Sequence, residues 1–384
     1  MLVTDLPTPA LLIDRARLLD NLTAMAERAT AQNVRLRPHI KTHKMTALAR
    51  LQQDHGADGV TVATVDEAEH FAAAGFSDVR VAYPVVGADK HDRLLALMAD
   101  GVAVSFTVDT QAGIAGANAA YAAAGRTVPV LLEIDVGHGR CGVAWDADEA
   151  LVAHAQAIQA ADALRLEGLL THAGQAYGGP RPHESKTEAL QRASTDEVER
   201  LLTAAMHLQA EGLVEQPERF VLSVGSTPTM QHFQNQTKGG FRITEIRPGN
   251  YVFYDAMQVG LGAARLEQCA LTVWSRVVSR RREANGTERV FVDAGKKILT
   301  TDTHDSIRGH GTVLYNARYM RPHPHAVIDR LSEEHGWLRV PGGATFDVGD
   351  AVRIVPNHAC VTVATQDHAY LVDGDEVVGT WSIA

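Results

Sequence analysis

The sequence predicts an α/β protein: a (β/α)₈ TIM barrel followed by a C-terminal all-β domain. Three observations support this fold class. Between about residues 34 and 248, short β-rich segments alternate with longer segments rich in alanine and leucine. After Gly262 the hydrophobic pattern changes to a period of two residues, which is typical of strands. The length of 384 residues also fits a barrel-sized domain plus a smaller one.

The barrel prediction depends on a series of eight β-rich segments. They begin near Val34, Val60, Val79, Val102, Val128, Leu166, Val221 and Ile243. Their mean spacing is roughly 30 residues, the size of one strand–helix unit. Helical segments end at glycines, as in 44–55 before Gly56 and 65–74 before Gly75. Eight such units favour a closed barrel over an open doubly wound sheet, because no GxGxxG signature follows the first strand.

The β domain is expected to contain roughly 120 residues at the C-terminal end. Strand-like runs lie at 270–278, 289–295, 351–364 and 368–383. The Asp-Gly-Asp run at 373–375 supplies a hairpin turn.

The N-terminal run 8–14 precedes a helix over 15–31 and is expected to add a strand to the β domain. The predicted domains are therefore a barrel over 14–255 and a β domain over 1–13 plus 256–384.

Composition narrows the class of protein. The net charge of −10 and the isoelectric point near 6.0 disfavour binding to duplex nucleic acid. Three cysteines, Cys141, Cys269 and Cys360, are too few for a secreted disulfide scaffold, and we read the first two as structural thiols. The N-terminal segment lacks the basic and apolar regions of a signal peptide, and no stretch approaches 18 apolar residues. These features predict a cytoplasmic enzyme that acts on a small molecule, with no membrane or nucleic-acid partner.

A candidate catalytic amine lies where the first barrel strand ends. In the run from Arg37 to Lys41, strand alternation places Arg37, His39 and Lys41 on one face. Barrel active sites lie at the carboxyl ends of the strands. A lysine there, with cationic neighbours that lower its pKa, suits a Schiff-base amine, and a solvated basic loop is the alternative.

The fifth and sixth strands bring further candidates to the same end of the barrel. The fifth ends with Glu133, Asp135, His138 and Arg140 among three glycines, which allow a ligand close to the backbone. A structural Asp135–Arg140 ion pair is the alternative. The sixth delivers His172 and Tyr177, and His172 is as compatible with a hydrogen-bonded core residue as with a catalyst.

A phosphate site is predicted from the last two barrel loops. Gly225-Ser226-Thr227 after the seventh strand offers hydroxyls and free N–H groups at a helix start, and Gly249 with Asn250 follows the eighth. Barrel phosphate sites are frequently built from these loops. A plain helix N-cap is the alternative for each loop alone.

A metal site is predicted in the β domain. His358 and Cys360 lie two residues apart on an expected strand, so both side chains should point the same way. Imidazole and thiolate favour zinc over magnesium or manganese, and water, substrate or a third side chain would complete the site. A buried cysteine beside an unrelated histidine is the alternative.

This constellation resembles the fold-type III pyridoxal phosphate (PLP) enzymes, whose barrel is alanine racemase-like. Within that group the chain resembles the D-serine dehydratase/D-threonine aldolase family. The matching stretches are TPALLID, LRPHIKTHK, EIDVGHGRCGV, LLTHAGQAY, SVGSTPT, EIRPGNYVFYD and PNHACVT, which appear in family order and cover nearly the whole chain.

The resemblance implies a role for each matching residue. Lys41 would carry the cofactor as a Schiff base and act as general base. Arg140 would lie beside the cofactor ring, Tyr177 would line the pocket, and Arg247 would face the pyridine nitrogen. The phosphate would be held by Gly225, Ser226, Thr227, Gly249 and Asn250.

The metal motif implies a reaction within the family. His358-Ala359-Cys360 resembles the His-x-Cys form of zinc-dependent D-serine and D-3-hydroxyaspartate dehydratases, rather than the His-Cys-Asp run of D-threonine aldolases. Dehydration of a D-β-hydroxy amino acid is therefore expected, with Zn²⁺ favoured and Mn²⁺ or Mg²⁺ as alternatives. Aldol cleavage, with His39 or His172 as base, is the alternative reaction.

Three rival functions are less favoured. A racemase would need a second base on the opposite ring face and no metal, and a PLP-carrier protein of this barrel type usually lacks the β domain. A metallohydrolase barrel would need a His-x-His motif near the first strand, where this chain has Arg37-Pro38-His39. The resemblance also implies a homodimer.

Overall fold

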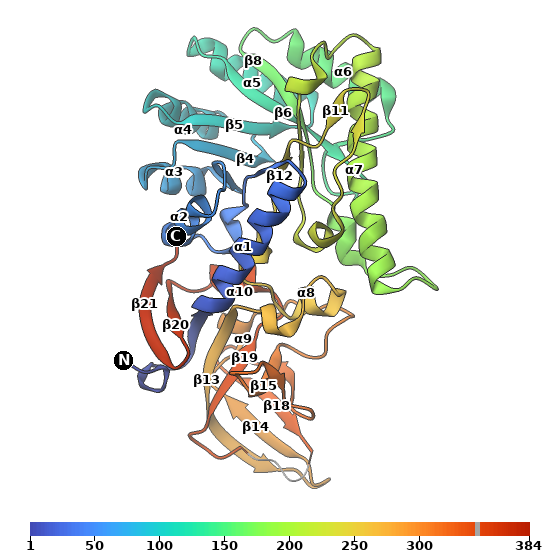
Figure 1. The fold of residues 1–384 in the computed structure, drawn as a ribbon. Helices are drawn as coiled ribbons and strands as arrows, with labels where there is room; N and C mark the ends of the chain where they lie inside the picture. The colour runs from blue at the N-terminus through green and yellow to red at the C-terminus, as the bar shows by residue number, and fades with distance from the viewer. Residues whose placement is uncertain (342–345) are drawn as a thin grey trace. The chain divides into compact units, whose positions relative to one another are not determined.

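A sheet of nine parallel strands, eight of them in one continuous series, forms the centre of one of the two units into which the chain folds (Figure 1). The computed structural model describes residues 1–341 and 346–384. The barrel unit contains Met25–Lys41 and Ala49–Gly249, and the β unit contains Met1–Ala24, Thr42–Leu48 and Asn250–Ala384.

The barrel strands match the eight predicted segments. They are β2 (Arg35–Leu36), β3 (Val60–Val62), β4 (Asp78–Pro84), β5 (Ala103–Val108), β6 (Val128–Asp135), β8 (Leu164–Thr171), β9 (Val221–Val224) and β12 (Glu245–Ile246). Their order is β2-β12-β9-β8-β6-β5-β4-β3, with every pairing parallel. A parallel bridge between His39 and Thr61 joins the two ends of this series, so the predicted barrel is confirmed.

Seven α-helices and three two-residue strands lie in the segments that connect the barrel strands or lead into them. The helices are α1 (Arg15–Ala31), α2 (Thr46–Asp54), α3 (Val65–Ala73), α4 (Ala88–Ala99), α5 (Gln111–Ala123), α6 (Asp148–Gln159) and α7 (Lys186–Ala210). The short strands are β7 (Val143–Ala144), β10 (Thr237–Lys238) and β11 (Phe241–Arg242).

Helix α3 illustrates why the sequence predicted these boundaries. The Thr64 hydroxyl accepts the Glu67 N–H at 3.1 Å, and the Glu67 carboxylate accepts the Ala63 N–H at 2.7 Å. The helix ends before Gly75, which takes φ +85° and so terminates it without strain. The predicted helices over 15–31 and 65–74 are confirmed to within one residue.

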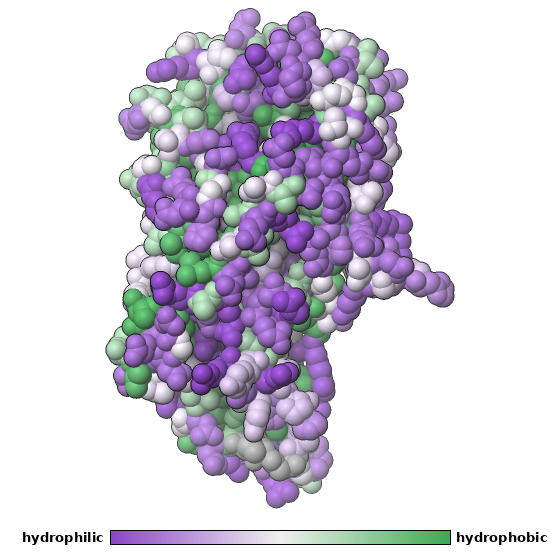
Figure 2. Space-filling view, in the orientation of Figure 1, coloured by the Kyte–Doolittle hydropathy of each residue, from purple (hydrophilic) through white to green (hydrophobic). Residues whose placement is uncertain are grey.

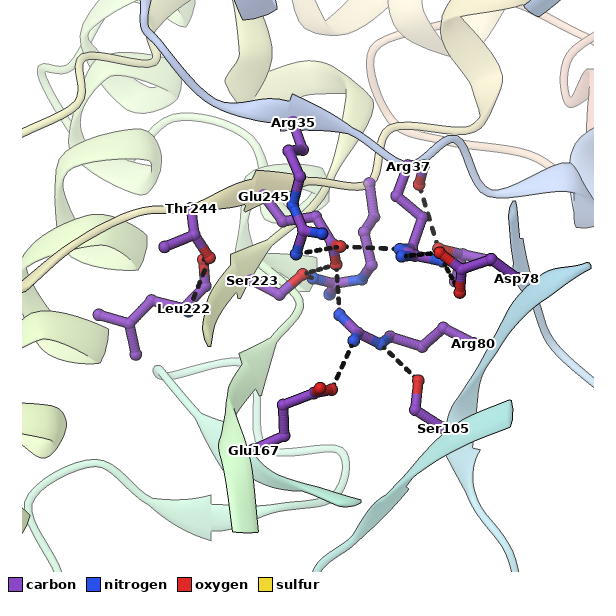
Figure 3. A network of polar contacts seen from close by, with 12 residues as sticks. Arg35, Arg37, Asp78, Arg80, Ser105, Glu167, Leu222, Ser223, Thr244 and Glu245 are labelled. Carbon is purple, nitrogen blue, oxygen red and sulfur yellow. Dashed lines mark hydrogen bonds and ion pairs between the residues drawn. The ribbon is translucent and has the colours of Figure 1, made fainter. Parts of the chain in front are cut away.

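The inside of the barrel carries a buried network of ion pairs (Figure 3). Glu245 is fully buried and accepts hydrogen bonds from Arg37 Nε and Arg80 Nη1, each at 2.7 Å. Arg37 also pairs with Asp78 at 2.6 Å, and Arg80 with Glu167 at 2.9 Å. Full pairing is what allows such charges to remain inside a protein.

The expectation that Arg37 shares a face with His39 and Lys41 is wrong. Strand β2 ends at Leu36, and Ile40–Thr42 forms a single 3₁₀ turn, so the two-residue period does not extend through this run. Arg37 therefore belongs to the buried network.

The described residues of the β unit form ten strands. They are β1 (Ala10–Asp14), β13 (Leu271–Arg282), β14 (Glu288–Val292), β15 (Thr312–Asn316), β16 (Arg321–Pro322), β17 (Val327–Leu331), β18 (Gly336–Val340), β19 (Ala351–Val355), β20 (His368–Asp373) and β21 (Glu376–Ser382). The main order is β16-β15-β19-β13-β1-β20-β21, while β14 pairs with β13 and β18, and β18 with β17. Short helices are α8 (Ala256–Leu261), α9 (Lys296–Leu299) and α10 (Ala359–Ala364).

The N-terminal segment joins this sheet as predicted. Strand β1 pairs antiparallel with β13 and parallel with β20. The predicted hairpin is also present, because Asp373 pairs with Glu376 across Gly374 and Asp375. The run 351–364, however, is a strand only as far as Val355. After Pro356 the chain turns, and the rest of the run forms α10.

Hydrophilic residues predominate on the face shown in Figure 2, and hydrophobic residues are scattered among them. Across residues 1–341 and 346–384, we find no helix with the length and apolar character that crossing a membrane requires.

Candidate active site

A cavity of about 550 Å³ lies in the barrel unit and gathers residues that follow several different strands. Six of the predicted site residues line it: His39, Lys41, Arg140, His172, Gly225 and Arg247. The rest of its wall is largely apolar, including Ala63, Ala82 and Leu170. A concave, mostly apolar space with a few convergent polar groups is the usual form of a small-molecule site.

Lys41 contributes an available amine to this cavity. It lies in the 3₁₀ turn after β2, and its side chain is exposed to the cavity. Within the described part of the chain its amine has no hydrogen-bond or ion-pair partner. A primary amine held in a cavity and unengaged by an acid is suited to forming a covalent bond with a carbonyl compound.

Two histidines stand beside this amine. The Nδ1 of His172 lies 2.7 Å from the Gly225 carbonyl oxygen, so Nδ1 carries the proton and Nε2 remains an acceptor. Burial, reinforced by the charges of Lys41 and Arg140, lowers the pKa of His172 to about 3. Burial and the charges of Lys41 and Arg247 also hold the pKa of His39 well below its ordinary value. Both imidazoles are therefore neutral at neutral pH.

Arg140 is oriented by an acid other than the one considered from the sequence. Its Nη2 lies 3.5 Å from Glu133 Oε1, and the Cys141 thiol donates to the same oxygen at 3.0 Å. Asp135 instead accepts backbone N–H groups of residues 137–139 at 2.8–2.9 Å. The alternative of an Asp135–Arg140 ion pair is thus wrong, because the glycine-rich turn folds back onto Asp135.

The thiol of Cys141 stays protonated. Burial, the hydrogen bond to Glu133 and the charge of that carboxylate raise the pKa of Cys141 to about 11. This agrees with the interpretation of Cys141 as a structural thiol.

Arg247 is fixed at the cavity wall by the barrel interior. Its Nη2 donates to the Thr171 carbonyl oxygen at 2.5 Å, and its Nη1 donates to Ser223 Oγ. Ser223 in turn donates to Glu245 at 2.5 Å, which links Arg247 to the network of Figure 3. Burial lowers the pKa of Arg247 to about 10, so the guanidinium is still charged at neutral pH.

The loop after β9 presents two buried hydroxyls. Ser226 and Thr227 are 3% and 6% exposed, and neither hydroxyl has a hydrogen-bond partner within the described residues. A side chain at Gly225 would lie 3.0 Å from Arg247 Cβ, so this position favours glycine. Unsatisfied buried donors are costly, and a phosphate group would satisfy them. The loop therefore fits a phosphate-bearing cofactor.

The predicted metal pair lies in the β unit at the start of α10. His358 is the residue before the helix and Cys360 is in its first turn, so their predicted placement on a strand is wrong. The two side chains nevertheless hydrogen bond to each other. The Nδ1 of His358 lies 2.7 Å from Asp302 Oδ2, which leaves Nε2 for another partner. The Cys360 thiol lies 3.2 Å from Thr42 Oγ1.

This pair provides two donors of the type that zinc prefers, with a carboxylate that orients the imidazole. Burial alone would lower the pKa of His358, but Cys360, Asp255 and Asp302 raise it to about 10. Three or more metal-binding side chains are not gathered anywhere in 1–341 or 346–384. The residues therefore fit a two-ligand site that water or substrate would complete.

Known families match most of the chain. Residues 13–256 match the family described as alanine racemase, N-terminal domain, and residues 270–372 match the putative serine dehydratase domain. D-threo-3-hydroxyaspartate dehydratase of Delftia sp. (strain HT23) is 34% identical, with 98% of this chain and 97% of that protein covered. D-threonine aldolase of Arthrobacter sp. is 31% identical, with 98% of this chain and 92% of that protein covered.

The chain belongs to the D-serine dehydratase/D-threonine aldolase family. Among solved structures, a cysteine-to-alanine variant of D-threo-3-hydroxyaspartate dehydratase in the metal-free form has a TM-score of 0.89 at 33% identity. It covers 100% of this chain and 99% of that one. The resemblance inferred from the sequence is confirmed, and family membership makes the chain a PLP-dependent enzyme.

Other predicted residues of this family member lie outside the lining of the cavity. Tyr177 is half-buried in the 3₁₀ segment Gly174–Gly178. Gly249 follows β12, and Asn250 is buried in the β unit, where its amide donates to Asp255 at 2.6 Å and lies 3.8 Å from Cys360 Sγ. The phosphate role of Gly249 and Asn250 and the pocket role of Tyr177 stay predictions.

One residue near the cavity was not predicted from the sequence: Glu197, a fully buried carboxylate on α7. Its Oε1 accepts the N–H groups of Ala173 and Gly225 at 3.2 and 2.9 Å, and its Oε2 accepts the Thr229 hydroxyl at 3.1 Å. Glu197 thereby ties the residue after His172 to the loop with the two hydroxyls. An available signal was its place on the apolar helix face of Ala193 and Leu201.

Proposed function

We propose that this family member is a PLP- and zinc-dependent lyase that removes water from a D-amino acid with a β-hydroxyl group. The observation that carries the proposal is the barrel cavity, which is lined by the Lys41 amine, by Arg140 and Arg247, and by Gly225, the residue that precedes two buried hydroxyls without a hydrogen-bond partner among the described residues. When bound, PLP supplies an electron sink for the α-carbon and zinc supplies a Lewis acid for the leaving hydroxyl.

The cavity residues have distinct proposed tasks. Lys41 would hold the cofactor covalently and would act as the general base at the α-carbon. Arg247 would be the residue at the ring nitrogen, where its retained charge would disfavour protonation. Arg140, oriented by Glu133, would lie beside the ring, and Tyr177 would border the substrate.

The phosphate and metal ligands come from separate segments. The phosphate is held by Gly225, Ser226, Thr227, Gly249 and Asn250. His358 and Cys360 hold the metal, and the thiolate favours Zn²⁺ over Mn²⁺ or Mg²⁺. Support for a metal comes from the related dehydratase, one of whose structures is in a metal-free form. We also propose a cytoplasmic location and, from the family resemblance, a homodimer. Size-exclusion chromatography with light scattering tests the oligomeric state.

Aldol cleavage is the second candidate, because the Arthrobacter D-threonine aldolase matches nearly the whole chain. It would require His39 or His172 to accept the hydroxyl proton. A pKa of about 3 makes His172 a weak base, which favours dehydration over cleavage.

A product assay tests the proposal. The purified protein should be yellow, with a band at about 420 nm from the lysine-bound cofactor. It should convert D-serine and D-threo-3-hydroxyaspartate to keto acid and ammonia, and chelation should abolish this turnover while the band persists. Glycine plus an aldehyde would identify an aldolase, and the enantiomer alone would identify a racemase. Turnover that is unchanged without zinc would refute the metal role.

A further inference from the structure

Lys90 is a cation in the cavity wall that the proposed reaction does not use. It lies in the first turns of α4 and is half-buried. Its Nζ lies 5.7 Å from the ring centroid of Tyr83, and both residues line the cavity. Within 1–341 and 346–384, the structure gives Lys90 no carboxylate partner.

The charges of the cavity wall are unbalanced. Glu133 is the one carboxylate among its described lining residues, and Arg140 and Cys141 already engage it. The wall also carries Lys41, Arg247 and Lys90. In the proposed function Lys41, Arg140 and Arg247 are all assigned to the cofactor. Lys90 then remains as a cation without an anion.

We propose that Lys90 binds a second carboxylate of the substrate, so that this enzyme prefers a D-3-hydroxy dicarboxylic amino acid such as 3-hydroxyaspartate. The inference rests on the proposed function and specifies its substrate class. A charge-assisted hydrogen bond between ammonium and carboxylate is strong and selective for the charged group. D-serine has no group for Lys90 to bind, and the methyl group of D-threonine would leave the ammonium unpaired.

Tyr83 and Val86 support a substrate site at this part of the wall. They remain 50% and 60% exposed although both line the cavity, which places Lys90 beside an open portion of it. The Tyr83 ring attracts the ammonium through its π face and so limits where Nζ can lie. The related Delftia enzyme bears the name of a dicarboxylic substrate, in agreement with this assignment.

Steady-state kinetics of the cofactor-loaded enzyme test the proposal. Lys90→Gln should lower kcat/KM for D-threo-3-hydroxyaspartate roughly 10- to 100-fold, mainly through KM, and change it less than about threefold for D-serine. Lys90→Arg, which keeps the charge, should recover most of the loss. Lys186→Gln, at an exposed position on α7, is the matched control and should leave kcat/KM unchanged for both substrates.

Binding provides a readout independent of turnover. By titration calorimetry, Lys90→Gln should weaken succinate binding at least about tenfold and leave propionate binding unchanged, because only succinate has a second carboxylate. Equal losses for both substrates, or an unaffected succinate affinity, would overturn the assignment. If the unmodified enzyme turns over neither amino acid, the proposed function fails, and the succinate and propionate affinities still decide the role of Lys90.

Discussion

The buried carboxylate of Glu197 leads to a prediction about stability and pH. Burial raises the pKa of Glu197 from an ordinary value of 4.5 to about 7, even though Gly225, Thr229 and Ala173 donate hydrogen bonds to it. Because the folded-state pKa is the higher one, the stabilising contribution is complete below about pH 4.5 and is lost as the pH rises to about 7. The difference between the unfolded-state and folded-state pKa values of Glu197 corresponds to about 3 kcal/mol of unfolding free energy.

The substitution Glu197→Gln removes this ionisation. The amide oxygen of the new side chain can still accept the N–H groups of Ala173 and Gly225, which Glu197 Oε1 accepts at 3.2 and 2.9 Å. The stability of the unmodified protein should therefore fall relative to that of Glu197→Gln between pH 4.5 and pH 8, because the other titrating groups contribute equally to both proteins. The difference between them should grow from near zero to about 3 kcal/mol.

Urea unfolding of the cofactor-free protein, followed by circular dichroism at several pH values, measures this difference. Glu199→Gln is the control, since Glu199 lies on the same helix with 47% of its side chain exposed and pairs with Lys238. That variant should keep the pH dependence of the unmodified protein. Parallel curves for the unmodified protein and Glu197→Gln would refute the reasoning.

Three further predictions concern the barrel, the phosphate loop and the metal pair. Glu245→Gln leaves two buried guanidinium groups short of a partner and should cost about 3–5 kcal/mol in urea unfolding, whereas Glu167→Gln, at a side chain 23% exposed, should cost less than about 1 kcal/mol. Equal costs would contradict the network. The double variant Ser226→Ala/Thr227→Val should weaken PLP binding at least about tenfold in a spectral titration, since each lost charge-assisted bond is worth about 1.5–3 kcal/mol; unchanged affinity would place the phosphate elsewhere. Cys360→Ala should abolish bound zinc in metal analysis while the yellow band remains, and full zinc content would exclude the thiolate as a ligand.

The barrel was predictable because its signals are local. Each strand is an apolar run followed by a helix with a polar start and a glycine stop, as Thr64 and Gly75 show around α3. The same regularity explains why Lys41 and His172 could be assigned to one cavity. Residues that follow parallel barrel strands come together at one end of the barrel.

The wrong predictions concern residues that lie just beyond the end of a strand, where the two-residue period of the strand no longer applies. The run after Pro356 alternates in the sequence, but small residues such as Ala359 and Ala364 allow a helix as readily as a strand. Arg37 lies just beyond the end of β2, where the two-residue period no longer applies. The place of Glu197 on the apolar face of α7 indicates that its side chain is buried, but not which groups it contacts, because those lie in two loops that are distant in the sequence.

The hydrogen-bonded series from Glu245 through Ser223 to Arg247 has a practical meaning for protein engineering. If Arg247 faces the cofactor ring as proposed, the electronic behaviour of that ring can be tuned from within the barrel, without altering any group that meets the substrate. Conservative changes at Ser223 would then alter the surroundings of the Arg247 guanidinium without replacing any residue that lines the cavity.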